Sequence, residues 1–287
     1  MNPVTLSLNG IDIAGNLYLP HANHHPCPAV VMAPGFGGVK EMLIPHYAHA
    51  LADAGIATLA VDYPYFGASA GEPRQQIQIQ SQLDSHTVAL DFLQQHSAID
   101  GENLGIWGSS LSGGHALVIA AIDTRVKSVL AIIPFISVSL KMAPRFTGIT
   151  VKDWFWRKVM GKSQTIKIAG KPHEQAVMNS DGAWQWMQEM TANAPNFVDH
   201  VSVSSLLEMA NYKTAKAARA IKVPLKVILA TDDTITPARM VKSALSKVEK
   251  VTFEEYPETH FELFDRHLQD TVESTVSWFQ QTLSNGS

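Results

Sequence analysis

The feature that most constrains the fold of this 287-residue chain is a regular alternation of short apolar runs with segments of helical length. Apolar runs bounded by glycine, proline and polar residues are typical of strands buried on both faces of a parallel sheet. The Asn9-Gly10 dipeptide near the N-terminus favours a hairpin turn between the first two runs. We predict eight strands, over Val4–Leu8, Ile11–Leu19, Ala29–Met32, Ile56–Val61, Leu104–Trp107, Ser128–Ile133, Leu225–Ala230 and Val251–Tyr256.

Segments with helical patterning separate most of the later strands. We expect helices over Leu43–Ala54, Gln82–His96, Leu111–Ala121, Arg239–Ser246 and Thr271–Leu283. Because strand–helix–strand units form right-handed crossovers, this order predicts an α/β fold. The expected architecture is an eight-stranded, mostly parallel sheet with helices on both faces.

The alternation is interrupted after the sixth strand. Residues from about 138 to 215 contain no convincing strand, but they hold four of the six tryptophans and several methionines. We therefore expect residues 1–137 and 216–287 to form the α/β core, and residues 138–215 to form a helical cap inserted into it. Its apolar residues could line an acyl pocket or form the core of the cap; they are Trp154, Phe155, Trp156, Met160, Met178, Trp184, Trp186, Met187 and Met190.

The stretch Gly105–Gly114 carries the most informative chemical signal. A strand ends and a helix begins around Ser110 with almost no loop between them, and small residues surround this serine. Such a turn is strained and lifts the serine above the edge of the sheet, at the positive N-terminal end of the helix. Ser110 is therefore the candidate nucleophile. The G-x-S-x-G motif is met only in part, because Ser112 replaces its last glycine.

An attacking serine needs a base and an acid, which follow it in the order Ser, Asp, His when it sits on this kind of turn. His260 is the candidate base, because it alone among twelve histidines lies in the loop after the last strand. The loop after the seventh strand offers Asp232 and Asp233 as the acid. Asp233, four residues before Pro237, is preferred, and Asp232 is the alternative. Both loops follow strand C-terminal ends, where open α/β sheets bind their ligands.

A glycine-rich segment, Gly35-Phe36-Gly37-Gly38, follows the third strand. Glycines let the backbone approach a reacting group closely and offer it N–H groups. We expect the backbone amides of Phe36 and Leu111 to form an oxyanion hole. Taken alone, the segment would be read as an ordinary glycine-rich turn.

Together these motifs resemble the α/β-hydrolase superfamily over essentially the whole chain. The resemblance is carried by Ala33–Gly38, Asp62–Gly71, Gly108–Gly114, Asp233 with Pro237, and Glu258–Phe261. The run Ser110–His115 is similar to a branch that contains serine aminopeptidase-like esterases and fungal polyketide thiohydrolases or acyltransferases. The resemblance implies a Ser-Asp-His triad, an oxyanion hole and a mobile cap. Besides Ser112, one residue departs from the pattern: Pro34 stands where many relatives have histidine.

The predicted activity is that of a serine hydrolase, which cleaves a carboxylic ester or thioester through an acyl-enzyme on Ser110. If an alcohol or amine replaced water, the same site would make an acyltransferase. A peptidase would need an acidic anchor for the substrate amine; the cap offers Asp153, Glu174, Asp181, Glu189 and Asp199. A non-catalytic binding protein with this fold is a further alternative, although such proteins usually lack a triad member.

Composition narrows the range of partners. The formal net charge is −4 and the pI is near 6.3, so no basic surface for nucleic acid is expected. No signal peptide and no run of about 18 apolar residues is recognised, which argues against a membrane span. The expected partner is a small-molecule ester or thioester, a homodimer is left open, and the cytoplasm is the default compartment.

The single cysteine, Cys27, cannot form an internal disulfide and is expected to be buried. His21, His24 and His25 lie near it in the sequence without a carboxylate partner. We therefore predict neither a metal site nor a cofactor.

Overall fold

The computed structural model describes residues 1–21, 26–138 and 143–283, and its largest feature is an eight-stranded sheet with the order β1-β2-β4-β3-β5-β6-β10-β11. All neighbouring strands are parallel except for β2, which runs antiparallel to β1 and β4. The predicted mostly parallel sheet is confirmed. The strands are β1 (Asn2–Leu8), β2 (Ile11–Tyr18), β3 (Cys27–Ala33), β4 (Ala57–Val61), β5 (Ile99–Ser109), β6 (Val126–Ile132), β10 (Leu225–Ala230) and β11 (Val251–Tyr256).

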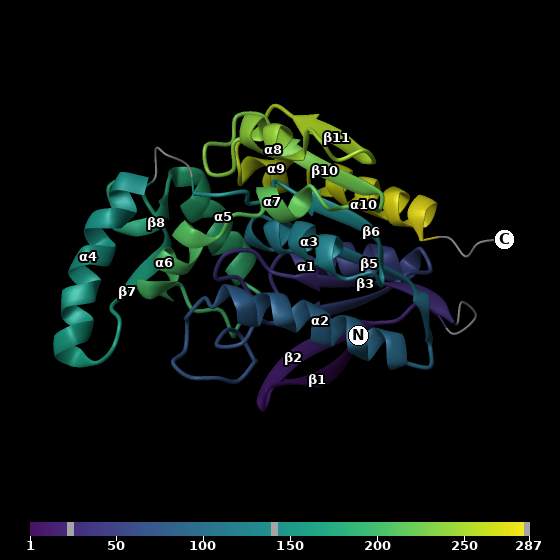
Figure 1. The fold of residues 1–287 in the computed structure, drawn as a ribbon, viewed down its shortest axis with the longest axis horizontal. Coiled ribbons are helices and arrows are strands. Elements are labelled where there is room, and N and C mark those ends of the chain that lie inside the picture. Colours follow the sequence, from purple (N-terminus) through teal and green to yellow (C-terminus); the bar gives the residue numbers. More distant parts are fainter. Residues whose placement is uncertain (22–25, 139–142, 284–287) are drawn as a thin grey trace.

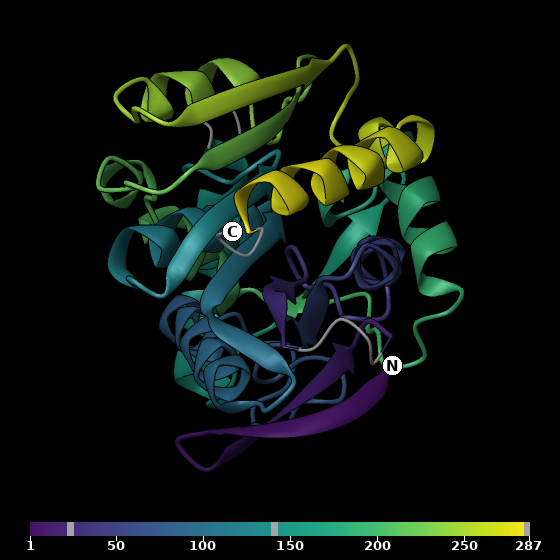
Figure 2. The ribbon, with the colours of Figure 1, turned by 90° about the vertical axis from the view of Figure 1, so that its right-hand side faces the viewer.

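Helices cover both faces of this sheet. On one face α1 and α10 pack against each other, whereas α2 and α3 lie together on the other (Figure 2). The helices of the core are α1 (Ile44–Asp53), α2 (Ile79–Gln95), α3 (Leu111–Ile122), α8 (Ala238–Leu245), α9 (Glu262–Arg266) and α10 (Leu268–Thr282).

Adjacent side chains of β5 enter separate apolar cores. Ile106 belongs to the core that includes Leu90 of α2 and Leu117 of α3. Trp107 belongs to the opposite core, where its ring centroid lies 4.8 Å from that of Tyr47. Because successive strand residues point to opposite faces, a strand covered on both sides has to be apolar at consecutive positions. The central strands were recognisable in the sequence for this reason.

The parallel strands bring sequence-distant loops to one edge of the sheet. β3, β5, β6, β10 and β11 all run in the same direction, so the segments that follow them lie at the same edge. These segments begin at residues 34, 110, 133, 231 and 257. All the candidate site residues are in or next to these segments.

The chain leaves the main sheet after β6 and rejoins it at β10, as expected for an insertion after the sixth strand. The insertion contains α4 (Ala143–Met160), α5 (Asp181–Thr191), α6 (Ser204–Asn211) and α7 (Ala215–Ala218). It also contains β7 (Thr165–Gly170), β8 (Ala176–Asn179) and β9 (Val201–Ser202), which form a second sheet in the order β8-β7-β9. The prediction that this region carries no strand is therefore wrong.

The missed strands are short, and they depend on partners distant in the chain. β7 pairs in parallel with β8 and antiparallel with β9, where Thr165 lies opposite Ser202. The available signal was the alternation in Thr-Ile-Lys-Ile at the start of β7, because Ile166 and Ile168 are both buried. The insertion is thus a mixed α/β unit at one end of the molecule, with α4 farthest from the main sheet (Figure 1).

Candidate active site

Ser110 lies at the turn between β5 and α3, in a strained backbone conformation with φ 54° and ψ −116°. A positive φ is uncommon outside glycine and has to be stabilised by the surroundings. The amide of Ser110 donates to the Ile132 carbonyl at 2.9 Å, and its carbonyl accepts from the Phe135 amide at 2.8 Å. These bonds fix the turn to the end of β6 and leave the serine side chain half-buried at the sheet edge.

Close backbone contacts explain the small residues around Ser110. A Cβ on Gly108 would lie 2.2 Å from the carbonyl oxygen of Ser112, and a Cβ on Gly114 would lie 2.5 Å from that of Phe135. No side chain fits at either position. The strand can therefore turn directly into the helix only because these two positions are glycine.

Ser112 takes part in the turn instead of weakening it. Its hydroxyl accepts a hydrogen bond from the Ser109 amide and donates one to the Ser109 carbonyl, both at 2.9 Å. The side chain is fully buried. The departure from the usual glycine thus adds two hydrogen bonds across the turn that holds Ser110.

The structure brings His260 and Asp233 to Ser110. The Nε2 atom of His260 lies 3.1 Å from Ser110 Oγ, and its Nδ1 atom lies 2.6 Å from Asp233 Oδ2. His260 and Asp233 are both buried, whereas Asp232 is exposed to solvent. Of the two candidate carboxylates, Asp233 is therefore the one that contacts the imidazole.

The surroundings of Asp233 favour its ionised form. Burial raises the pKa of this carboxyl, but His260 and the hydrogen bonds from His260 and Thr236 outweigh burial and hold the pKa below its ordinary value. Thr236 donates its hydroxyl to Oδ2 at 2.7 Å, and the amides of Ile235 and Thr236 donate to Oδ1. An ionised carboxylate can only accept, so Nδ1 of the neutral imidazole carries the proton and Nε2 is free to accept one from Ser110.

The glycine-rich segment after β3 runs beside the serine, as its expected role requires. A Cβ on Gly35 would lie 3.5 Å from the Cβ of Ser110, and Phe36 lines the same cavities as this serine. Leu111 is the first residue of α3, so its amide has no carbonyl partner within the helix. The amides of Phe36 and Leu111 therefore lie in two segments that flank Ser110.

A buried ion pair anchors this segment, and sequence reasoning did not identify it. Lys40 donates its amide to Asp62 Oδ1 at 2.8 Å and its ammonium to Asp62 Oδ2 at 2.7 Å. The Ala68 amide also donates to this carboxylate. Burial opposes the charge of Lys40, yet Asp62 and Glu41 hold the pKa of Lys40 above its ordinary value. The pair joins the segment after Gly38 to the residue that follows β4.

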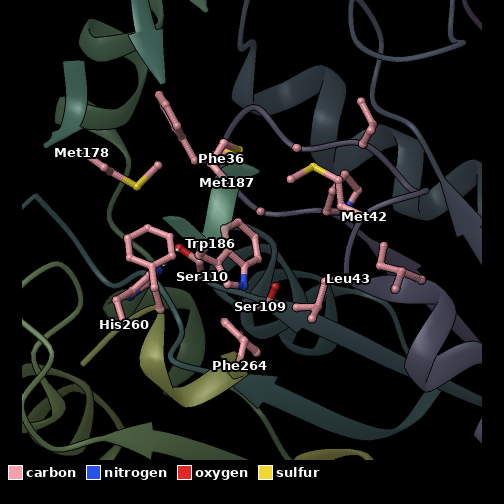
Figure 3. Close-up of a pocket in the computed structure, with 16 residues that line it drawn as sticks. Phe36, Met42, Leu43, Ser109, Ser110, Met178, Trp186, Met187, His260 and Phe264 are labelled. Carbon is pink, nitrogen blue, oxygen red and sulfur yellow. Dashed lines mark hydrogen bonds between the residues drawn. The ribbon is translucent and has the colours of Figure 1, made fainter. Parts of the chain in front are cut away.

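Two apolar cavities meet at Ser110. The first, with an empty volume of about 580 Å³ that includes space open to solvent, is bordered by Ser110 and His260, by the segment between β3 and α1, and by α9 and the insertion (Figure 3). The second, of about 510 Å³, includes Ser110 and Leu111 but not His260. We refer to them as the His260 cavity and the Leu111 cavity.

The insertion supplies part of the wall of each cavity. Trp186 and Met187 of α5 line the His260 cavity, and Leu206 and Met209 of α6 line the Leu111 cavity, while Met178 borders both. The indole Nε1 of Trp186 is buried and has no hydrogen-bond partner among the described residues. A buried tryptophan N–H usually has one, so this donor is available to a bound molecule.

The apolar residues of α4 that were expected in an acyl pocket lie elsewhere. Trp154, Phe155, Trp156 and Met160 are exposed on α4, and they line neither cavity. Met190 packs against the core on the same face of α5 as Trp186, as their spacing indicated. The sequence identified the insertion as apolar, but it did not show which residues face the serine.

The single cysteine lines neither cavity. Cys27 is buried, with burial raising its pKa. His24 and His25 lie outside the described residues. Among the described residues, no three His, Cys, Asp or Glu side chains are grouped closely enough to hold a metal ion. No helix in the described ranges is long and apolar enough to cross a membrane.

Comparison with known proteins gives a consistent family assignment. Residues 24–266 match the family model described as serine aminopeptidase, S33. The chain is 28% identical to the quorum-quenching protein AidA of Acinetobacter baumannii, over 94% of this chain and 92% of that protein. It is 26% identical to the thiohydrolase aneE of Aspergillus aculeatus, over 97% of this chain and 92% of that protein.

The fold is also similar to solved structures. The structure of DcsB in complex with its substrate analogue superposes with a TM-score of 0.87 and 21% sequence identity, and the match covers 99% of both chains. At this level of identity the similarity shows a shared fold.

Proposed function

Because the chain belongs to the serine aminopeptidase, S33, family of α/β hydrolases, we propose that it cleaves carboxylic ester or thioester bonds through an acyl-enzyme on Ser110. The observation that carries this proposal is the continuous chain of contacts from Ser110 Oγ through His260 to Asp233, at 3.1 and 2.6 Å. An aligned nucleophile, base and carboxylate of this kind is the arrangement needed for two-step acyl transfer.

In the first step, the hydroxyl of Ser110 attacks the substrate carbonyl while His260 Nε2 takes its proton. Asp233 keeps the imidazole in the required tautomer and stabilises the imidazolium that forms. The amides of Phe36 and Leu111 bind the developing oxyanion, where one such donor is worth about 3 kcal/mol. The imidazolium then gives its proton to the leaving alcohol or thiol, and the acyl group remains on Ser110.

In the second step, His260 removes a proton from a water molecule that attacks the acyl-enzyme. The tetrahedral intermediate forms in the same oxyanion hole, and Ser110 leaves with the proton held by His260. The products are a carboxylic acid and the free enzyme. An alcohol or amine in place of this water would give acyl transfer by the same chemistry.

The two cavities support an assignment of the substrate class. The leaving group needs a proton from His260, so we assign it to the His260 cavity and the acyl chain to the Leu111 cavity. Both walls are dominated by apolar side chains, such as Leu43 and Phe264 in the first and Leu206 in the second. The proposed substrate is therefore apolar on both sides of the scissile bond.

The lining also favours an ester or thioester over a peptide with a free amino terminus. No Asp or Glu is among the described residues that line either cavity. Of the carboxylates considered as amine anchors, Asp153 is buried against Ser163 and Gln164, and Glu174 pairs with Lys167. The thiohydrolase name of one relative fits cleavage of a thioester.

The test is hydrolysis of p-nitrophenyl esters by the wild-type protein and by Ser110→Ala. We expect the substitution to abolish turnover while the circular dichroism spectrum and the unfolding midpoint stay close to wild type. Ser109→Ala is the control and should keep its turnover, because the hydrogen bond to His260 comes from the neighbouring Ser110 hydroxyl. Equal turnover by wild type and Ser110→Ala would refute the proposal.

A further inference from the structure

Large exposed apolar side chains are concentrated on α4. Of ten such residues in the described part of the chain, six lie on this helix: Val151, Trp154, Phe155, Trp156, Val159 and Met160. Figure 1 shows α4 at the end of the molecule farthest from the main sheet. Single exposed apolar residues are ordinary on a protein surface, but a contiguous group of this kind marks an interaction site.

The outward face of α4 carries a continuous apolar stripe. Val151, Phe155 and Val159 are spaced four residues apart and so share one face of the helix. Their exposed fractions are 52%, 61% and 81%. On the inward face, Asp153 is buried and accepts hydrogen bonds from the Ser163 hydroxyl and the Gln164 amide. The helix is thus held from one side and presents its stripe on the other.

Basic side chains surround this stripe. Lys152, Arg157, Lys158 and, just after the helix, Lys162 are all exposed, and the only acid between residues 147 and 162 is the buried Asp153. The ammonium of Lys158 lies 3.8 Å from the ring centroid of Trp154. The whole chain has 26 acidic against 22 basic residues, so this end is positive and the remainder is negative. Such a charge distribution turns α4 toward an anionic surface.

We propose that α4 binds reversibly to the surface of an anionic lipid bilayer. The stripe of Val151, Phe155 and Val159 enters the boundary between head groups and acyl chains, and the lysines contact the lipid phosphates. Tryptophan is enriched at this depth in membrane proteins, which suits Trp154. Bound in this way, the protein would meet apolar substrates where they accumulate. This inference does not depend on the activity proposed above.

The charges disfavour the other simple partner, a second copy of the chain. In an antiparallel pair of α4 helices centred on Phe155, Lys152 would face Lys158 of the other copy. No exposed acid on α4 offsets this repulsion, and like charges in register weaken such a pair. A bilayer with negative head groups can both bury the apolar stripe and attract the lysines.

The test is flotation of the full-length protein with phosphatidylcholine vesicles that contain about a third phosphatidylserine, compared with pure phosphatidylcholine vesicles. We expect binding to the anionic vesicles only, with loss at high salt. Phe155→Ser with Val159→Ser, and Lys152→Glu with Lys158→Glu, should each lower partitioning at least tenfold. One control is Ile122→Ser, which removes an exposed apolar side chain at the end of α3. The other is Lys247→Glu with Lys250→Glu, which reverses two exposed charges away from α4.

The circular dichroism spectrum and the unfolding midpoint, expected to be unchanged in all four variants, show that each one is folded. Absence of flotation with anionic vesicles, or equal binding to both kinds of vesicle, would overturn the proposal. So would a concentration-dependent dimer that is abolished by Phe155→Ser in a protein that does not bind vesicles, since α4 would then be a self-association surface.

Discussion

The hydroxyl of Ser112 bonds to both the amide and the carbonyl of Ser109, the residue immediately before Ser110. The position that departs from the usual glycine motif therefore holds the turn together with a side chain. Since both bonds are buried, their loss leaves two backbone groups of Ser109 without this partner. An unsatisfied buried group typically costs about 1–3 kcal/mol.

We therefore expect Ser112→Ala to lower the free energy of unfolding by about 1–3 kcal/mol, as measured by urea denaturation. Turnover should fall as well, because the same bonds position Ser110. Ser246→Ala, which removes an exposed serine–backbone hydrogen bond at the end of α8, is the matched control and should change stability little. Equal stability of Ser112→Ala and wild type would show that these bonds are dispensable.

The two neighbouring aspartates give a direct test of the acid. Asp233→Asn should keep the fold but favour the wrong imidazole tautomer, which lowers kcat by about 10⁴-fold in enzymes with this arrangement. Asp232→Asn removes the same charge from an exposed neighbour and should leave kcat near wild type. Comparable losses in both variants in a p-nitrophenyl ester assay would contradict the assignment of Asp233.

The two cavities predict that substitutions in each one change the preference for a different side of the substrate. Met209→Trp partly fills the Leu111 cavity and should lower kcat/KM for long acyl chains more than for acetyl esters. Leu43→Trp partly fills the His260 cavity and should instead discriminate against bulky alcohol groups. A matrix of esters that varies both sides measures the two effects, with the exposed Leu207→Trp as control. If both variants discriminated on the same side of the substrate, the assignment of the acyl chain and the leaving group to separate cavities would be wrong.

The Lys40–Asp62 pair predicts a large effect on stability. Removal of one partner from a buried ion pair typically costs about 3–5 kcal/mol, because the other charge stays buried without compensation. We expect Lys40→Met to lower the free energy of unfolding by this amount in urea titrations. Lys242→Met breaks the exposed pair with Glu255 and should cost less than about 1 kcal/mol. Similar costs for the two substitutions would mean that the buried pair is not a structural anchor.

Two buried histidines, one on α2 and one on α3, predict that acid lowers the stability of the fold. Burial lowers the pKa of His86 to about 3, and it also lowers that of His115, whose ring bonds Gln82 and Tyr212. Between pH 3 and the ordinary histidine value of 6.5, the unfolded chain binds protons that the folded chain does not, so stability falls as pH decreases through this window.

Each such histidine contributes at most about 1.4 kcal/mol per pH unit to the pH dependence of the free energy of unfolding. Replacing His86 by Gln keeps a hydrogen-bond partner for the Tyr63 hydroxyl and should remove the contribution of one histidine from this slope. The free energy of unfolding from pH 6.5 downward measures the effect. An unchanged slope in His86→Gln would contradict a neutral, buried His86.

Much of the fold could be predicted from the sequence, because the central strands are buried on both faces. The apolar run around Ile106 and Trp107 records this burial directly. The candidate site residues could also be predicted from their order in the sequence, because the loops that follow parallel strands lie at one edge of the sheet. The short strands β7 to β9 were missed because their stability comes from pairing across distant segments, as between Thr165 and Ser202.

Some features of the site could not be read from residue types at all. Asp232 and Asp233 are adjacent and chemically identical, and only the path of the loop after β10 decides which one meets His260. Lys40 and Asp62 are 22 residues apart, and nothing in the chain marks them as partners. The walls of the two cavities depend on the rotation of α5 and α6, which local patterning does not define.

The most direct measurement of the central claim is labelling with a fluorophosphonate, followed by peptide mass spectrometry. We expect one adduct on Ser110, none in Ser110→Ala, and much slower labelling in His260→Ala, since His260 activates this hydroxyl. Labelling at a different residue, together with esterase activity that survives in Ser110→Ala, would contradict the assignment of Ser110 as the nucleophile.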